Sequence, residues 1–138
     1  MQLFISGNNL TDEIPSSYCN FTSLRVLAEL EYIGHIPKEL EELKSLHVLN
    51  LSHNNLTGQI PSSLGNMTEL ESLDPSSNKL EGWIPEQLTS LTFLSVLNLS
   101  HDKLEGDIPQ GKQFNTFSNN SYIGNSRLLG TMGCVDFH

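Results

Sequence analysis

Histidines are the residues of this chain that first suggest a reactive site, because imidazole can ligate a metal ion or act as a general base. Two of the five, His53 and His101, stand in the matching phrases Ser-His-Asn and Ser-His-Asp. If these phrases lie two stacked strands apart, the rings are about 10 Å from each other, too far to share one ion at bond lengths of about 2.1 Å. No Ser-His-Asp arrangement, phosphate loop or His-Glu-x-x-His motif is evident. We therefore expect no catalytic residue, no metal site and no cofactor.

Asparagine side chains give a better-founded chemical signal, since Asn-x-Ser/Thr is the acceptor sequence for N-linked glycans. Such sequons occur at Asn9, Asn20, Asn50, Asn55, Asn66, Asn98 and Asn119. Several of them are the recurring words Asn-Leu-Ser and Asn-Leu-Thr, so each one alone is weak evidence. The sequence predicts possible glycosylation at these positions if the chain is secreted.

The overall charge limits the class of partner. Sixteen acidic residues face seven basic ones, which gives a net charge of −9. Nucleic acids and anionic membranes select a basic surface, so neither is expected as a partner. Two cysteines, Cys19 and Cys134, are too few for a disulfide framework. No apolar run approaches about 20 residues, so we expect no direct insertion into a membrane, and residues 1–8 do not resemble a signal peptide.

A 24-residue repeat organises the chain. Ile-Pro steps begin at residues 14, 36, 60, 84 and 108, with spacings of 22, 24, 24 and 24. Between the last four steps one template recurs: Leu-x-x-Leu-x-Leu-x-x-Asn-x-Leu-x-Gly-x-Ile-Pro. The Leu-x-Leu alternation predicts a short strand with buried leucines. The asparagine can pair with backbone groups at the following turn, and glycine and proline set the local backbone. Segments such as Pro61–Met67 predict short helical turns on the opposite, convex side.

These features predict a leucine-rich-repeat solenoid, an α/β-type right-handed superhelix with parallel strands on its concave face and 3-10 turns on its convex face. Outward-pointing residues of the strands would then gather into one binding surface. The residues expected there are Val48, Asn50, Ser52, His53, Ser72, Asp74, Ser76, Val96, Asn98, Ser100 and His101. This surface is small and polar, and it lacks the tryptophan, tyrosine and arginine anchors typical of binding hot spots. A glycan on Asn50 or Asn98 would obstruct it, whereas Asn20 and Asn66 are expected on the convex side.

The repeats resemble those of plant leucine-rich-repeat receptor-like proteins. The phrase Leu-x-Gly-x-Ile-Pro is typical of plant extracellular repeats, a class that also includes receptor kinases and polygalacturonase-inhibiting proteins. The segment Gln-Gly-Lys-Gln-Phe-Asn-Thr-Phe at 110–117, followed by Ser-Tyr-Ile-Gly-Asn at 121–125, is similar to the closing segment of the receptor-like proteins. The resemblance implies the membrane-proximal end of an extracellular repeat domain. It also implies protein or peptide partners, including a co-receptor kinase, at the extracellular face of the plasma membrane.

Four departures from the family pattern suggest a truncated member. Met1 falls inside a repeat, and the unit from Leu24 to Pro37 is two residues short. Pro75 replaces a strand leucine and removes a ladder donor, at an expected cost of about 3 kcal/mol. In the tail, Leu129 stands where the family has a cysteine, which leaves Cys134 without its usual partner. We expect a partial first repeat at 1–23, a shortened fused repeat at 24–45, regular repeats at 46–109, a cap-like segment at 110–130 and a divergent tail at 131–138.

The resemblance implies a non-enzymatic binding or scaffold module that perceives a defence or developmental signal through partner kinases. Two alternatives stay open. One is an inhibitor-type repeat protein that binds a secreted enzyme such as a polygalacturonase, and the other is a non-functional gene remnant. An acidic convex patch at Glu39, Glu41 and Glu42 is expected to be a solvated face only.

Overall fold

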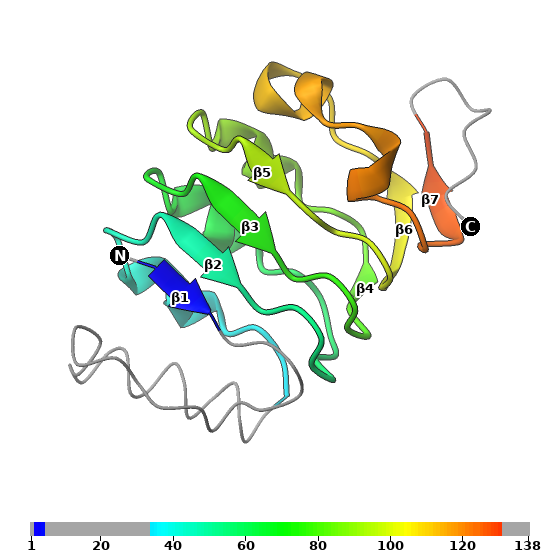
Figure 1. Ribbon diagram of the computed structural model, residues 1–138, viewed down its shortest axis with the longest axis horizontal. Coiled ribbons are helices and arrows are strands. Elements are labelled where there is room, and N and C mark those ends of the chain that lie inside the picture. Colours follow the sequence, from blue (N-terminus) through cyan, green and yellow to red (C-terminus); the bar gives the residue numbers. More distant parts are fainter. Residues whose placement is uncertain (1, 5–33, 131–138) are drawn as a thin grey trace.

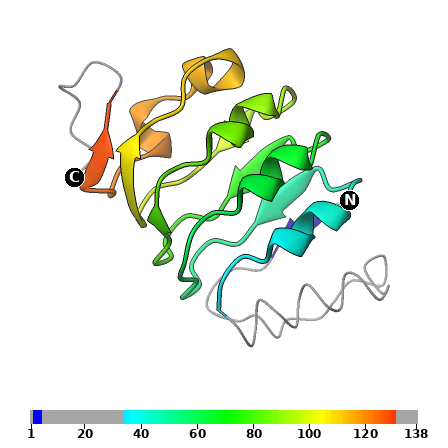
Figure 2. The same cartoon turned by 180° about the vertical axis from the view of Figure 1, so that it is seen from behind.

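The computed structural model describes residues 2–4 and 34–130, which stack as a curved array of repeats. A parallel sheet lines one face, and short helices line the opposite face (Figures 1 and 2). The sheet has the order β1-β2-β3-β5. Its strands are β1 (Gln2–Phe4), β2 (Val48–Asn50), β3 (Ser72–Asp74) and β5 (Val96–Leu97). The predicted solenoid, with strands on one side and 3-10 turns on the other, is confirmed.

The convex side consists of 3-10 helices. They are η2 (Lys38–Glu42), η3 (Ser62–Asn66), η4 (Glu86–Ser90), η5 (Lys112–Thr116) and η6 (Asn119–Ser121). Helices η2 to η4 each follow an Ile-Pro step, whose proline has an extended backbone and so ends the preceding segment. A leucine in the first turn then closes the helix, as Leu64 does when its N–H donates to the carbonyl of Pro61 at 3.2 Å. That leucine is fully buried, which ties each turn to the core.

Neighbouring convex helices pack closely. A Cβ added to Gly65 in η3 would lie 2.8 Å from the carbonyl carbon of Gln87 in η4. The hydroxyl of Ser90 donates to the carbonyl of Gly65 at 2.8 Å, across the same contact. Gly65 is therefore required by the close approach of two turns and not by its own backbone conformation.

A second parallel sheet, which the sequence analysis did not predict, lies at the side of the array (Figure 1). Its strands are β4 (Glu81–Gly82), β6 (Lys103–Asp107) and β7 (Arg127–Leu129). The bridges His35 to Thr57 and Gln59 to Glu81 continue the pairing into earlier repeats. The template glycine allows the backbone to form this second sheet. Gly82 has a φ of 78°, a conformation that residues with a side chain rarely adopt.

Asparagines at one template position tie each repeat to the previous one. The Oδ1 of Asn78 accepts the N–H of Leu56 at 3.1 Å. Its Nδ2 donates to three carbonyls, those of Leu51, Pro75 and Ser76. Asn125 acts in the same way on Leu104 of the repeat before it. The predicted role of this asparagine at the turn is confirmed, because each amide satisfies backbone groups that no sheet ladder reaches.

Pro75 shortens the main sheet by one pair. In the two equivalent places the N–H of Leu51 donates to the carbonyl of Asp74, and that of Leu99 to the carbonyl of Ser121. Proline has no N–H, so the carbonyl of Asn98 lacks the corresponding ladder donor. Strands β2 and β3 accordingly pair over three residues, whereas β3 and β5 pair over two. The predicted loss of a ladder donor is confirmed, although the proline itself lies just after β3.

The segment after the last Ile-Pro step continues the stack. Phe114 is buried and makes an edge-to-face contact with Phe117, with ring centroids 5.4 Å apart. Tyr122 and Leu128 complete the core at this end. Strand β1 pairs directly with β2. Residues 24–33 of the shortened repeat predicted at 24–45 lie outside the described residues. The same holds for Cys19, Cys134 and the tail from 131 to 138.

Candidate functional site

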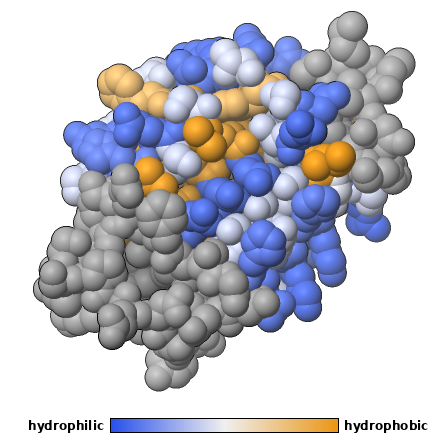
Figure 3. Space-filling view, viewed as in Figure 1, coloured by the Kyte–Doolittle hydropathy of each residue, from blue (hydrophilic) through white to orange (hydrophobic). Residues whose placement is uncertain are grey.

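The candidate site is the concave face formed by the main sheet. Parallel pairing sets Val48, Ser72 and Val96 in one row across three repeats. A second row holds Asn50 and Asp74, with Asn98 at the equivalent place in the next repeat. Val96 is 54% exposed and the other five residues of the two rows are partly exposed, so apolar and polar groups lie side by side on an accessible surface. Figure 3 shows this mixture as small hydrophobic areas among hydrophilic ones.

Three residues predicted on this face turn inward instead. Ser52, Ser76 and Ser100 are buried, with 7%, 3% and 5% of their surface exposed. The residue two positions before each serine accepts the serine N–H on its side-chain Oδ1 and so caps the turn; these residues are Asn50, Asp74 and Asn98. The Oδ1 of Asp74 accepts both the N–H of Ser76 at 3.1 Å and its hydroxyl at 2.6 Å. Their placement on the binding surface was wrong because the alternation of a strand does not continue past this turn.

Beyond the turn, His53, Ser77 and His101 have positive φ values of 58°, 56° and 57°. Residues with a side chain rarely adopt this left-handed conformation. It is held by cross-repeat hydrogen bonds, such as that from the N–H of His53 to the carbonyl of Ser76 at 3.1 Å. The two histidines are exposed at the edge of the concave face. Among residues 34–130, no three His, Cys, Asp or Glu side chains gather where a metal ion would bind.

An acidic cluster lies at the other edge of the face, where the strands begin. His47 is 3.9 Å from the carboxylate of Glu69 and 3.6 Å from that of Glu71. Its Nδ1 also lies 3.1 Å from the carbonyl of Glu69. Together with Asp74, the two glutamates give the concave face an acidic character beside the row that contains Val48 and Val96. Sequence analysis did not single out His47 or Glu71, although both directly precede a predicted outward position.

The sequons within the described residues fall on different faces. Asn66 is exposed in η3 on the convex side, as expected, and its Nδ2 donates to Glu41 at 2.8 Å. Asn55 and Asn119 are exposed as well. Asn50 and Asn98 lie on the concave sheet, where their Oδ1 atoms accept the N–H groups of Ser52 and Ser100. Asn9 and Asn20 lie outside the described residues, and glycan occupancy stays a prediction throughout.

Asp102 is a buried carboxyl at the template position that asparagine holds elsewhere. Its Oδ1 accepts the N–H of Leu80 at 3.0 Å, as the Oδ1 of Asn78 does from Leu56. Its Oδ2 therefore takes the place of an amide nitrogen, and it has no hydrogen-bond partner among residues 34–130. Burial raises the pKa of Asp102 to about 7. The N–H groups of Leu80 and Asn78 act against this rise, and the charge of Asp74 adds to it. Burial also raises the pKa of Tyr122 to about 12.

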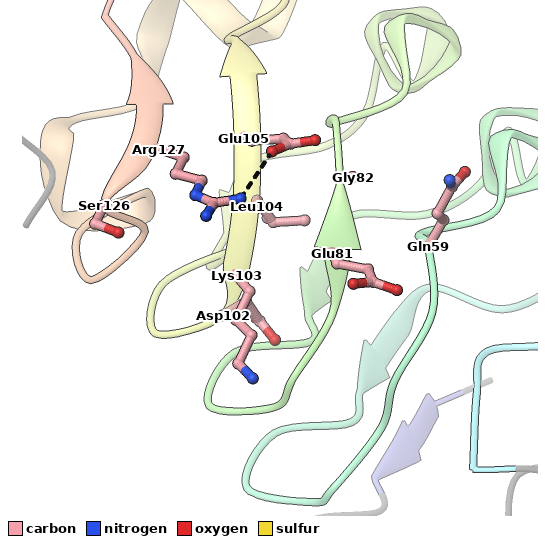
Figure 4. A pocket seen from close by; sticks show the side chains of 9 residues that line it. All are labelled: Gln59, Glu81, Gly82, Asp102, Lys103, Leu104, Glu105, Ser126 and Arg127. Carbon is pink, nitrogen blue, oxygen red and sulfur yellow. Dashed lines mark ion pairs between the residues drawn. The ribbon is translucent and has the colours of Figure 1, made fainter.

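A charged hollow of about 480 Å³ lies over the second sheet (Figure 4). Its rim carries charges of both signs from adjacent strands, namely Glu81, Lys103, Glu105 and Arg127. Arg127 points to Glu105, with Nη1 and Oε2 3.6 Å apart. Because these charges alternate along the strands, the hollow has no strong preference for an anion or a cation.

Two exposed aromatic residues were missed by the sequence analysis. Trp83 and Phe93 are each 65% exposed. Trp83 stands between the glycine and the isoleucine of the template, where the neighbouring repeats have Gln59 and Asp107. Comparing the variable template positions would have revealed an aromatic residue among polar ones.

Comparison with known sequences identifies the repeats. A family model described as leucine rich repeat matches residues 44–104, and a second model of that description matches residues 1–21. The chain is a leucine-rich-repeat protein. Receptor-like protein 35 of Arabidopsis thaliana is 50% identical over 60 residues, which is 41% of this chain and 6% of that protein. The resemblance of these repeats to plant receptor-like proteins is thereby confirmed.

Solved structures of plant receptor ectodomains share the fold. The BIR2 ectodomain from Arabidopsis thaliana is 33% identical with a TM-score of 0.67, covering 75% of this chain and 54% of that one. The ectodomain of the Arabidopsis receptor kinase HAESA, solved in complex with an IDA peptide hormone, is 39% identical with a TM-score of 0.63. That match covers 75% of this chain and 17% of HAESA. The matched chains are ectodomains, and none of these matches indicates an enzyme family. No helix within the described ranges is long and apolar enough to cross a membrane.

Proposed function

We propose that this chain is a protein-binding segment of a plant cell-surface receptor-like protein, with its concave face as the docking surface. The observation that carries the proposal is the register of the main sheet, which aligns Val48, Ser72 and Val96 across three repeats. An aligned, partly apolar row on a rigid sheet can receive an extended peptide or the edge of a partner domain.

The composition of the face sets the partner chemistry. The acidic groups Glu69, Glu71 and Asp74 favour a partner with basic or amide groups opposite them, because like charges would repel. The exposed Val96 and Phe93 supply the apolar contact. The HAESA ectodomain, which shares the fold, is in complex with a peptide hormone, and this supports a peptide or protein as partner. The same proposal places the chain at the extracellular face of the plasma membrane, near the membrane-proximal end of the repeat domain. It also includes signal perception through a co-receptor kinase.

Selection of random dodecapeptides displayed on phage against the full chain tests the docking surface. The expected result is a set of peptides that bind the natural chain and lose at least about tenfold in affinity with Val96→Arg, since a long charged side chain blocks the row. Thr68→Arg, in the exposed turn after η3, carries the same added charge and should bind normally. Peptides that bind the Val96→Arg chain as well as the natural one would contradict the proposal.

A further inference from the structure

Trp83 lies in a groove that is separate from the concave face. The groove has a volume of about 980 Å³ and crosses three consecutive repeats. Its walls are the Ile-Pro steps at 60–61, 84–85 and 108–109, together with the segments just before and after them. Since repeats stack about 4.8 Å apart, the groove is about 10 Å long, which fits three or four residues of extended chain.

The indole of Trp83 is positioned to contact a bound ligand. The residue directly follows β4, and a Cβ added to Gly106 on the neighbouring strand would lie 3.8 Å from its own Cβ. Gly106 has no side chain, so it adds no side-chain atoms next to Trp83 on this side. An exposed tryptophan on a groove wall is unusual for a surface that only contacts water, and tryptophan is enriched among the residues that dominate binding energy.

The charges of the groove have one sign. Among its lining residues Glu86 and Asp107 are the charged ones, both exposed, and no lysine or arginine lines it. This distinguishes it from the hollow over the second sheet, where acidic and basic side chains alternate. The net charge of −9 adds a long-range attraction for a basic ligand.

We propose that the Trp83 groove binds an extended basic segment of a partner protein. An arginine or lysine side chain lies with its aliphatic stem and cation over the indole. Its charged head is directed to Glu86 and Asp107, and the Ile-Pro steps contact the flanking apolar atoms. A neutral saccharide could stack on the same ring, but it would gain nothing from two carboxylates that have no basic neighbour in the groove.

Trp83 is the sole tryptophan of the chain, so its fluorescence reports on this groove alone. The probe is an eight-residue peptide that alternates arginine and threonine, added to the full chain while acrylamide quenching is measured. We expect the peptide to lower the quenching constant about threefold and to shift the emission to shorter wavelength, because the ring leaves water. The same peptide with glutamate in place of arginine should have no effect.

Variants separate the groove from the rest of the surface. The double variant Glu86→Gln, Asp107→Asn keeps the fluorophore and should weaken binding about tenfold, with a smaller salt dependence. Phe93→Ala, which removes an equally exposed aromatic ring elsewhere, should bind like the natural chain. Val96→Arg should also leave binding unchanged, so failure of the concave face as a docking surface would not affect this result.

Three outcomes would overturn the proposal. The first is failure of the basic peptide to protect Trp83 at about 1 mM, the limit of a weak specific contact. The second is unchanged affinity of the double variant for the peptide, which would remove the role of the carboxylates. The third is protection of Trp83 by cellohexaose where the peptide gives none, which would make the groove a saccharide-binding site.

Discussion

Replacing Asp102 with asparagine is expected to stabilise the protein at neutral and higher pH while changing little in acid. In the natural chain the Oδ2 of Asp102 occupies the place where Asn78 and Asn125 present an amide nitrogen to backbone carbonyls. When protonated, the carboxyl can donate there like an amide. When ionised, it sets a negative charge against carbonyl oxygens inside the protein. The asparagine variant supplies the donor at every pH.

The magnitude follows from the pKa. Burial raises the pKa of Asp102 from 3.8 to about 7, so the folded protein holds this proton more tightly than the unfolded chain. The stabilisation is complete below pH 3.8 and is lost as the pH rises to about 7 and beyond. The difference between these two pKa values corresponds to about 4 kcal/mol in the free energy of unfolding. For a chain of this size, that is a fall in the melting midpoint of about 15 °C between pH 4 and pH 8.

Thermal unfolding followed by circular dichroism from pH 4 to pH 8 measures this effect. Asp102→Asn should have a flatter profile than the natural chain and a higher midpoint above pH 6. Asp107→Asn removes an exposed carboxylate from β6 and controls for the loss of one negative charge. If the natural chain and Asp102→Asn lost stability in parallel as the pH rose, burial of this carboxyl would not be the cause.

Three further substitutions test the packing of the repeats. Pro75→Leu should restore the ladder donor to the carbonyl of Asn98 and raise the free energy of unfolding by about 1 kcal/mol in urea titrations; an unchanged midpoint would mean that the ladder at this position is not limiting. Gly65→Ala should lower that free energy by about 2 kcal/mol, because its methyl group meets the carbonyl of Gln87, and full stability would contradict the close approach of η3 and η4. Asn78→Ala should lower the free energy of unfolding by about 3 kcal/mol and speed amide hydrogen exchange in its repeat, because it leaves buried backbone groups unpaired. Asn55→Ala, at an exposed residue, should leave the exchange rates almost unchanged.

The main sheet and the convex turns could be predicted from the sequence because both repeat within one unit. Leucine at positions such as Leu49 and Leu73 marks the buried side of a strand, and the proline of the Ile-Pro steps at 36–37, 60–61 and 84–85 marks the start of a helix. These signals are local, and a 24-residue period multiplies them. Pro75 was predictable for the same reason, since one altered residue stands out against its copies.

The second sheet and the buried serines could not be predicted in this way. Strand β4 has two residues, and it forms only because adjacent repeats bring their backbones together there. Ser76 continues the alternation of β3 in the sequence, but Asp74 bends the chain before that alternation can act. The side chain of Trp83 is visible in the sequence, yet its groove depends on three repeats stacked side by side.

Pro75 and Asp102 impair the same junction, and this determines where the array would part first. A non-proline residue at position 75 would donate its N–H to the carbonyl of Asn98 in the next repeat, and Pro75 cannot. Asp102 of that next repeat accepts the N–H of Leu80 across the same interface. In a stack held by nearest-neighbour contacts, the weakest interface opens before the others. Pulled from its two ends at neutral pH, the molecule should therefore separate between the unit at 70–93 and the unit at 94–117. In acid this interface should become more stable, because protonated Asp102 can donate a hydrogen bond there. The missing N–H of Pro75 does not depend on pH.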